Sequence, residues 1–119
     1  MLTISNNGFI SLTRGDSFTV PLFINRGTVF HPVRYYIADN PNAAVYLGVM
    51  EPNQPFERAI IRKKYTSKSK TNEFGDLIID FSPSDTQYLF PGKYYYEIKV
   101  RLSDGSVDTI VPETEFFIF

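Results

Sequence analysis

The stretch between residues 89 and 100 constrains the fold more than any other part of the 119-residue chain. A Pro-Gly pair at 91–92 leads into eight residues that alternate with a period of two. One face carries Tyr94, Tyr96, Ile98 and Val100, and the other carries Tyr95, Glu97, Lys99 and Arg101. This alternation predicts a strand that is buried on one side and exposed on the other.

The residues around Tyr94 predict a sharp corner in front of this strand. A leucine at position 89, the Pro-Gly turn and an inward tyrosine are what the corner before strand F of an immunoglobulin-like sandwich requires. We expect the Tyr94 hydroxyl to donate to backbone across the corner while its ring fills the core. Burying a phenol without that hydrogen bond would cost about 1–3 kcal/mol.

A single helical turn is predicted just before the corner. Ser82 suits the N-cap, Pro83 suits the first helical position and Asp85 suits the third. Only one turn can form, because Pro91 follows soon after. We therefore expect a strand, a one-turn crossover and then the strand that begins at Tyr94.

Other stretches with the same alternation predict further strands. They cover residues 2–5, 9–12, 17–24, 43–50, 57–65, 76–81, 94–101 and 107–119, with a short strand at 35–37. Pro21 cannot donate to a neighbouring strand, so its strand should lie at an edge or contain a bulge. Asp104-Gly105 predicts a hairpin before the last strand, which should be interrupted near Pro112.

Together these elements predict one all-β domain over residues 1–119. Its architecture would be an immunoglobulin-like β-sandwich of seven to eight antiparallel strands, with a one-turn helix in the E–F crossover. The structural corner would be formed by Ser82, Asp85, Leu89, Gly92 and Tyr94. A chain of this length can bury roughly two-thirds of its unfolded surface, so a core without covalent staples is feasible.

Composition excludes several classes of site. The chain has no cysteine, which rules out a disulfide scaffold, a thiolate zinc site and a cysteine nucleophile. Its net charge of −1 gives no global field toward nucleic acid or a membrane. No apolar run approaches the ~20 residues of a membrane span, and no secretion signal is recognisable at the start of the sequence. We expect neither a membrane nor a nucleic acid as partner.

No motif in the sequence indicates catalysis. His31 is the only histidine, and it lies in an irregular stretch without a Gly-x-Ser-x-Gly elbow anywhere in the chain. The aspartates do not form the Asp-x-Asp-x-Asp-Gly loop of a calcium site and instead suit turns and caps. We therefore expect no enzyme and assign no catalytic, cofactor or metal residues.

Outward aromatic side chains are the first candidate for a functional surface. By alternation, four aromatic residues on separate parts of the chain should face away from the core, namely Phe23, Tyr95, Phe117 and Phe119. Since a lone monomer seldom exposes a large apolar patch, they could form a contact surface. Alternatively, an extra strand or the irregular segment 28–42 could cover them.

A basic stretch is the second candidate. Six of the twelve basic residues fall between positions 58 and 70. Within the expected strand over 57–65, the alternation places Arg58, Arg62 and Lys64 on one face. The candidate basic edge consists of Arg58, Arg62, Lys63 and Lys64. It could contact phosphates or an acidic partner, but the favoured interpretation is an edge strand whose charges discourage aggregation.

The spacing of several short motifs resembles that of a known family. The motifs are Arg14-Gly15-Asp16-Ser17-Phe18, Gly75-Asp76-Leu77-Ile78-Ile79, Ser84-Asp85-Thr86, the segment from Pro91 to Ile98, and Asp104-Gly105. The chain is similar to the small immunoglobulin-like domains of tailed-bacteriophage virion proteins, and most closely to the N-terminal domain of baseplate upper proteins.

This resemblance implies a non-enzymatic structural or accessory virion protein. Such a module docks onto other virion proteins, as a homo-oligomer or within a larger assembly, and is assembled in the host cytoplasm. A position in the tail, the baseplate or the capsid surface stays open. The alternative is a carbohydrate- or receptor-binding module, which would use Tyr35, Tyr36, Tyr46 or Tyr65 as stacking platforms.

Overall fold

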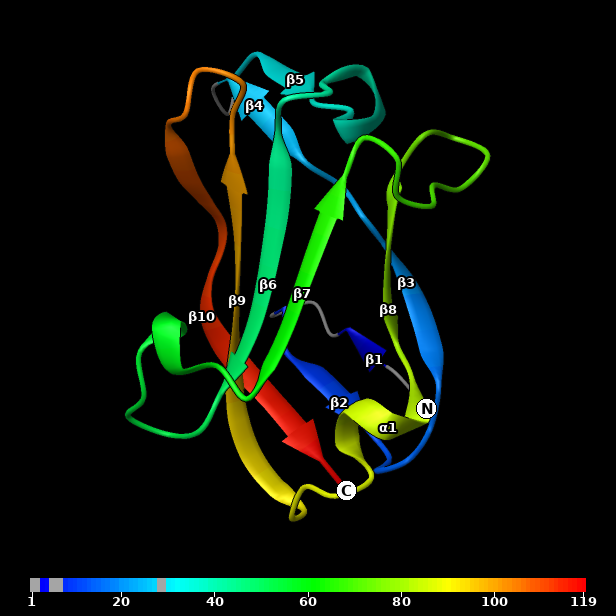
Figure 1. The fold of residues 1–119 in the computed structure, drawn as a ribbon, viewed down its shortest axis with the longest axis vertical. Helices are drawn as coiled ribbons and strands as arrows, with labels where there is room; N and C mark the ends of the chain where they lie inside the picture. The colour runs from blue at the N-terminus through cyan, green and yellow to red at the C-terminus, as the bar shows by residue number, and fades with distance from the viewer. Residues whose placement is uncertain (1–2, 5–7, 28–29) are drawn as a thin grey trace.

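A computed structural model describes residues 3–4, 8–27 and 30–119 of the chain. In this part of the chain the fold is built from strands, with only short helices, so the all-β prediction is confirmed (Figure 1). The strands are β1 (Thr3–Ile4), β2 (Ile10–Leu12), β3 (Phe18–Leu22), β4 (Asn25–Gly27), β5 (Pro32–Arg34), β6 (Ala44–Met50), β7 (Ile61–Thr66), β8 (Leu77–Phe81), β9 (Gly92–Arg101) and β10 (Val107–Ile118). The helices are the 3₁₀ turns η1 (Ile37–Asp39) and η2 (Phe56–Arg58) and the single α-turn α1 (Pro83–Thr86).

The strands form one large sheet and two small ones. The large sheet has the order β1-β2-β10-β9-β6-β7, in which β10 pairs antiparallel with β9 but parallel with β2. The β3–β8 pair forms a second layer over one face of this sheet (Figure 1). The β4–β5 hairpin lies at the end of the molecule opposite α1 and the C-terminus (Figure 1).

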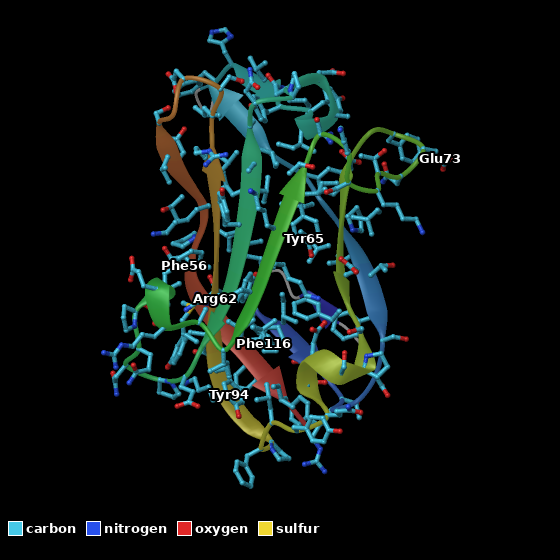
Figure 2. All side chains as sticks on the ribbon, viewed as in Figure 1. Phe56, Arg62, Tyr65, Glu73, Tyr94 and Phe116 are labelled. Atoms are coloured by element: carbon cyan, nitrogen blue, oxygen red, sulfur yellow. The ribbon has the colours of Figure 1, made fainter. Side chains whose placement is uncertain are left out.

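The core lies between these two layers and follows the alternation of the strands. Phe116 on β10 is fully buried, and its ring lies 5.6 Å from that of Phe81 on β8 and 6.2 Å from that of Tyr96 on β9. Phe18 on β3 packs against Phe81 with ring centroids 5.3 Å apart. Aromatic rings in successive contact therefore connect the two layers, and the buried Phe116 links the rings of the two sheets (Figure 2).

Three local predictions about strands and turns are confirmed. β3 pairs only with β8 among the described strands, so Pro21 lies in an edge strand. The β9–β10 hairpin turns at Gly105, whose φ is +89°, and Asp104 Oδ1 accepts from the Ser106 N–H at 2.9 Å. The irregularity predicted near Pro112 is present as register shifts between β10 and β9, one between Thr109 and Val111 and one between Val111 and Thr114, although β10 itself is continuous.

Several predicted features differ from the structure. The described residues form ten strands rather than seven to eight, and β2 pairs with β10 in parallel, so the prediction of purely antiparallel strands is wrong. Residues 35–37 do not form a strand: Ile37 begins η1 and its side chain is buried. The strand predicted over 57–65 begins only at Ile61, because residues 56–58 form η2. The prediction that Arg58 lies on this strand is therefore wrong. The strand predicted over 2–5 falls partly outside the described residues, which contain β1 over Thr3–Ile4.

The free edge of β8 is covered by hydrogen bonds rather than by another strand. Three N–H groups on the side away from β3 have acceptors. The Ile78 N–H donates to the Lys70 carbonyl at 3.1 Å, and the Asp80 N–H donates to the Tyr65 hydroxyl at 3.3 Å. The Ser82 N–H donates to Asp85 Oδ2 at 2.8 Å. The Tyr65 hydroxyl also donates to Asp80 Oδ1 at 3.1 Å, and burial raises its pKa well above the ordinary value. The second layer thus presents no unpaired donors along this part of its edge.

The turn α1 is capped as the sequence predicts, and a lysine of the large sheet strengthens the cap. Asp85 Oδ2 accepts from the Ser82 N–H and lies 2.7 Å from Lys63 Nζ on β7. Burial alone would raise the pKa of Asp85, but the hydrogen bonds from Lys63 and from the Ser82 backbone outweigh burial, so the pKa lies below its ordinary value. Ionised Asp85 therefore stabilises the fold.

This cap predicts a pH dependence of stability. A carboxyl with a lowered folded-state pKa contributes stability above its unfolded pKa and loses it as the pH falls through the folded pKa. Acidification from about pH 5 to about pH 2 should therefore lower the free energy of unfolding, and should do so less in Asp85→Asn, measured by urea denaturation. Asp108→Asn is the matched control, because this carboxyl is exposed on β10. Equal acid sensitivity of wild type and Asp85→Asn would contradict the assigned role.

The corner before β9 has the hydrogen bond expected from the sequence. The Tyr94 ring is buried and its hydroxyl donates to the Phe90 carbonyl at 2.7 Å (Figure 2). Leu89 packs against the core from the corner loop, and Gly92 begins β9 with a φ of +154°. Burial raises the pKa of Tyr94, with a further contribution from Glu51.

Removing this hydroxyl should destabilise the protein. We expect Tyr94→Phe to lower the free energy of unfolding by about 1–2 kcal/mol, because the Phe90 carbonyl loses its donor. Tyr95→Phe is the control on the opposite face of the same strand and should change it by less than about 0.5 kcal/mol. Chemical denaturation of the two variants would show the prediction to be wrong if both shifted equally.

Candidate contact surface on the large sheet

The face of the large sheet that points away from β3 and β8 carries a row of aromatic side chains. Alternation along β9 and β10 buries Tyr94, Phe116 and Ile118, and so turns Tyr95, Phe117 and Phe119 outward. Phe117 contacts Phe9 edge-on at 5.6 Å and stacks with Phe119 at 6.4 Å. We call the set of Phe9, Tyr95, Phe117 and Phe119 the aromatic row.

A shallow hollow lies between Phe9 and Tyr95. Its volume is about 490 Å³, and Phe9 and Tyr95 line it together with Glu113, Thr114 and Glu115. The segment that carries Phe9 is held in place because the Tyr96 hydroxyl donates to the carbonyl of Gly8. Phe119 is the most accessible member, with 67% of its surface exposed.

The charges beside the aromatic row are of both signs. Lys93 Nζ lies 3.6 Å from Glu115 Oε1 and 5.8 Å above the Tyr95 ring. Both partners of this pair are nearly half exposed, so the pair contributes little to stability. An apolar strip with paired charges along its side has the composition of a protein–protein interface, with an apolar centre and a polar rim.

Two further aromatic side chains project from the same end of the molecule. Tyr88 and Phe90, on the loop between α1 and β9, are 86% and 84% exposed. Arg14 connects this loop to the aromatic row, since its N–H donates to the Phe119 carbonyl at 2.9 Å and its Nη1 to the Leu89 carbonyl at 3.5 Å. Exposed aromatic groups thus continue from the sheet face onto the corner loop.

The structure brings together three of the four aromatic residues predicted to form an interface. Phe23 is 58% exposed, as expected, but it lies beyond β3, where the Arg34 guanidinium sits 4.8 Å above its ring. It therefore does not belong to the aromatic row. Phe9, by contrast, was missed, although the inward positions of Ile10 and Leu12 place Phe9 outward by the same alternation.

Only some residues of the candidate basic edge are exposed. Arg62 and Lys64 are exposed on β7, the last strand of the large sheet, but Lys63 points inward to Asp85 with only 20% of its side chain exposed. Arg58 is exposed on η2 rather than on the strand. Alternation explains this division, because Ile61 and Tyr65 are buried and Lys63 shares their side of β7.

The other candidate site residues are scattered. Tyr65 is buried and bonded to Asp80, so it is not available as a stacking platform, whereas Tyr35, Tyr36 and Tyr46 are half-buried. His31 is exposed at the start of β5. Within the described ranges no three His, Cys, Asp or Glu side chains come close enough to hold a metal ion. No helix in these ranges is long and apolar enough to cross a membrane.

Comparison with known proteins gives no family for the chain. No protein-family model matches the sequence, and no curated protein matches it.

Proposed function

We propose that the chain is a non-enzymatic, immunoglobulin-like docking module of a larger protein assembly, and that this assembly is the virion of a tailed bacteriophage. The observation that carries the docking role is the aromatic row of Phe9, Tyr95, Phe117 and Phe119 on an open sheet face. The similarity of the short motifs to virion domains supplies the phage context.

The topology supports the immunoglobulin-like part of the proposal. β10, β9, β6 and β7 lie side by side in the order of strands G, F, C and C′, and β3 and β8 pair as strands B and E do. The hydrogen bond from Tyr94 to Phe90 occupies the position of the tyrosine corner before strand F. Proteins with the same fold can have unrelated functions, so we infer the function of this chain from its exposed residues.

The aromatic row supports docking because aromatic side chains dominate the energy of protein interfaces. Soluble monomers seldom expose contiguous apolar patches, and those that exist commonly mark contact sites. Phe117 and Phe119 stack on each other and so present a preformed apolar surface. A partner that covered this row and its rim would need to bury about 1,000 Å² or more in total to persist.

The docking role predicts the behaviour of two matched variants. Phe117→Ser combined with Phe119→Ser should weaken association with other subunits by about 2 kcal/mol or more, because it removes the centre of the surface. Phe23→Ser removes another exposed aromatic group, which lies outside the aromatic row, and should have no effect. Sedimentation velocity of the pure protein would measure self-association, and mass spectrometry of purified phage particles would measure incorporation.

Two results would contradict the proposal. If the chain is a monomer at all concentrations and is absent from particles, the virion role is wrong. If the double variant and Phe23→Ser are incorporated equally well, the docking surface lies elsewhere.

The alternative, a carbohydrate- or receptor-binding module, has weaker support. Tyr65 is buried, and the Tyr46 ring lies below the cations of Lys64 and Arg101, at 5.8 Å from each. A glycan array would detect such binding directly, and a hit that is lost in Tyr46→Ala would favour this alternative.

A further inference from the structure

A second surface feature, separate from the aromatic row, is a groove between β6, β7 and η2. Its volume is about 430 Å³, which is in the range of ligand and peptide pockets. Its lining is mainly apolar and includes Tyr46, Gly48, Phe56 and Ala59. Its charged members are Glu57, Arg62 and Lys63, of which Lys63 is paired with Asp85.

Gly48 is required for the shape of this groove. A Cβ at this position would lie 2.8 Å from Phe56 Cε2 and 3.1 Å from the Cβ of Ala59. A side chain at position 48 would therefore displace the Phe56 ring, which lies against the sheet where η2 forms one wall of the groove.

Arg62 is held in a fixed orientation beside this wall. Its Nε donates to the Ala59 carbonyl at 3.1 Å, and one Nη donates to the Glu57 carbonyl (Figure 2). A guanidinium has five N–H donors, so these two bonds orient it and leave donors for a ligand. A pre-oriented guanidinium binds a carboxylate with less entropy loss than a free side chain.

Further cations surround the two rings of the groove. Lys99 Nζ lies 4.7 Å from the centre of the Phe56 ring, and Lys64 and Arg101 flank the Tyr46 ring. Lys99 and Arg101 belong to β9, an interior strand of the large sheet, so protection of the sheet edge does not account for them.

The charges around the groove do not cancel. The cations are Arg62, Lys64, Lys99 and Arg101, and the nearby carboxylates are Glu57, which lines the groove, and Glu97, which lies 3.6 Å from Lys99. Four positive and two negative groups leave an excess of two positive charges. Among the described residues, the ion pairs do not include Arg62, Lys64 or Arg101.

We propose that this groove binds an acidic linear segment of a partner protein. One or two carboxylates of the segment would bind Arg62 and the cations on β9, and an aromatic or aliphatic side chain beside them would pack against Phe56 and Tyr46. The combination of an apolar lining with surplus positive charge fits such a segment better than a nucleic-acid backbone, which offers phosphates but requires a longer basic track.

A labelled peptide provides a direct test on the full chain. The probe is an N-acetylated pentapeptide with four glutamates around a central phenylalanine, and its binding is followed by fluorescence anisotropy. We expect affinity that falls with added salt, that falls when alanine replaces the phenylalanine, and that disappears for the lysine counterpart of the peptide.

A pair of double variants with equal charge loss locates the binding. Arg62→Gln with Arg101→Gln should weaken binding of the pentapeptide by about tenfold or more. Lys68→Gln with Lys70→Gln removes two exposed cations outside the groove and should leave the affinity within about twofold of wild type. Circular dichroism of both variants checks that the fold is retained.

Three outcomes would overturn the proposal. They are no binding of the pentapeptide up to about 1 mM, equal weakening by the two double variants, and tighter binding of a single-stranded oligonucleotide that is lost in Arg62→Gln with Arg101→Gln. The last outcome would assign the groove to nucleic acid. None of the three depends on self-association or on incorporation into particles, so failure here is distinguishable from failure of the docking role.

Discussion

The alternation of side chains at the end of β10 determines both the core and the exposed surface of this protein. Phe116 and Ile118 are buried, and Phe117, between them, faces outward, with Phe119 beyond. The strand is paired on both sides, in parallel with β2 and antiparallel with β9, so its register is fixed twice. A slip of one residue would exchange the buried and exposed sets. The aromatic row is thus a direct consequence of how the core is filled.

Much of the fold could be predicted because its signals are local. The corner at Tyr94, the cap of α1 and the hairpin at Gly105 each depend on residues a few positions apart, and each is present as predicted. Residues 35–37 behaved differently, because Ile37 is buried in the core and begins the 3₁₀ turn η1, while Tyr35 and Tyr36 lie outside any strand or helix. Tertiary packing overrode strand propensity there, and a single sequence does not show such packing.

The candidate surfaces were predictable only in part. Alternation gave the outward direction of Tyr95, Phe117 and Phe119, but it could not show that Phe23 lies apart from them. Likewise, counting basic residues identified Lys63, but it could not show that Lys63 pairs with Asp85 of α1 instead of facing solvent. The groove beside Phe56 was not foreseen, because it depends on the close approach of a ring to Gly48 and has no motif in the sequence.

The hydrogen bonds along β8 have a consequence for the behaviour of the chain at high protein concentration. The N–H groups of Ile78, Asp80 and Ser82 already have acceptors, and Pro21 on the neighbouring strand β3 has no N–H. Another polypeptide therefore has few free backbone donors with which to form a cross-β pair there. Copies of the chain at high concentration would then contact one another along this edge through side chains rather than through the main chain. Contacts of that kind depend on which side chains are present, so a substitution can change them without opening this edge to main-chain pairing.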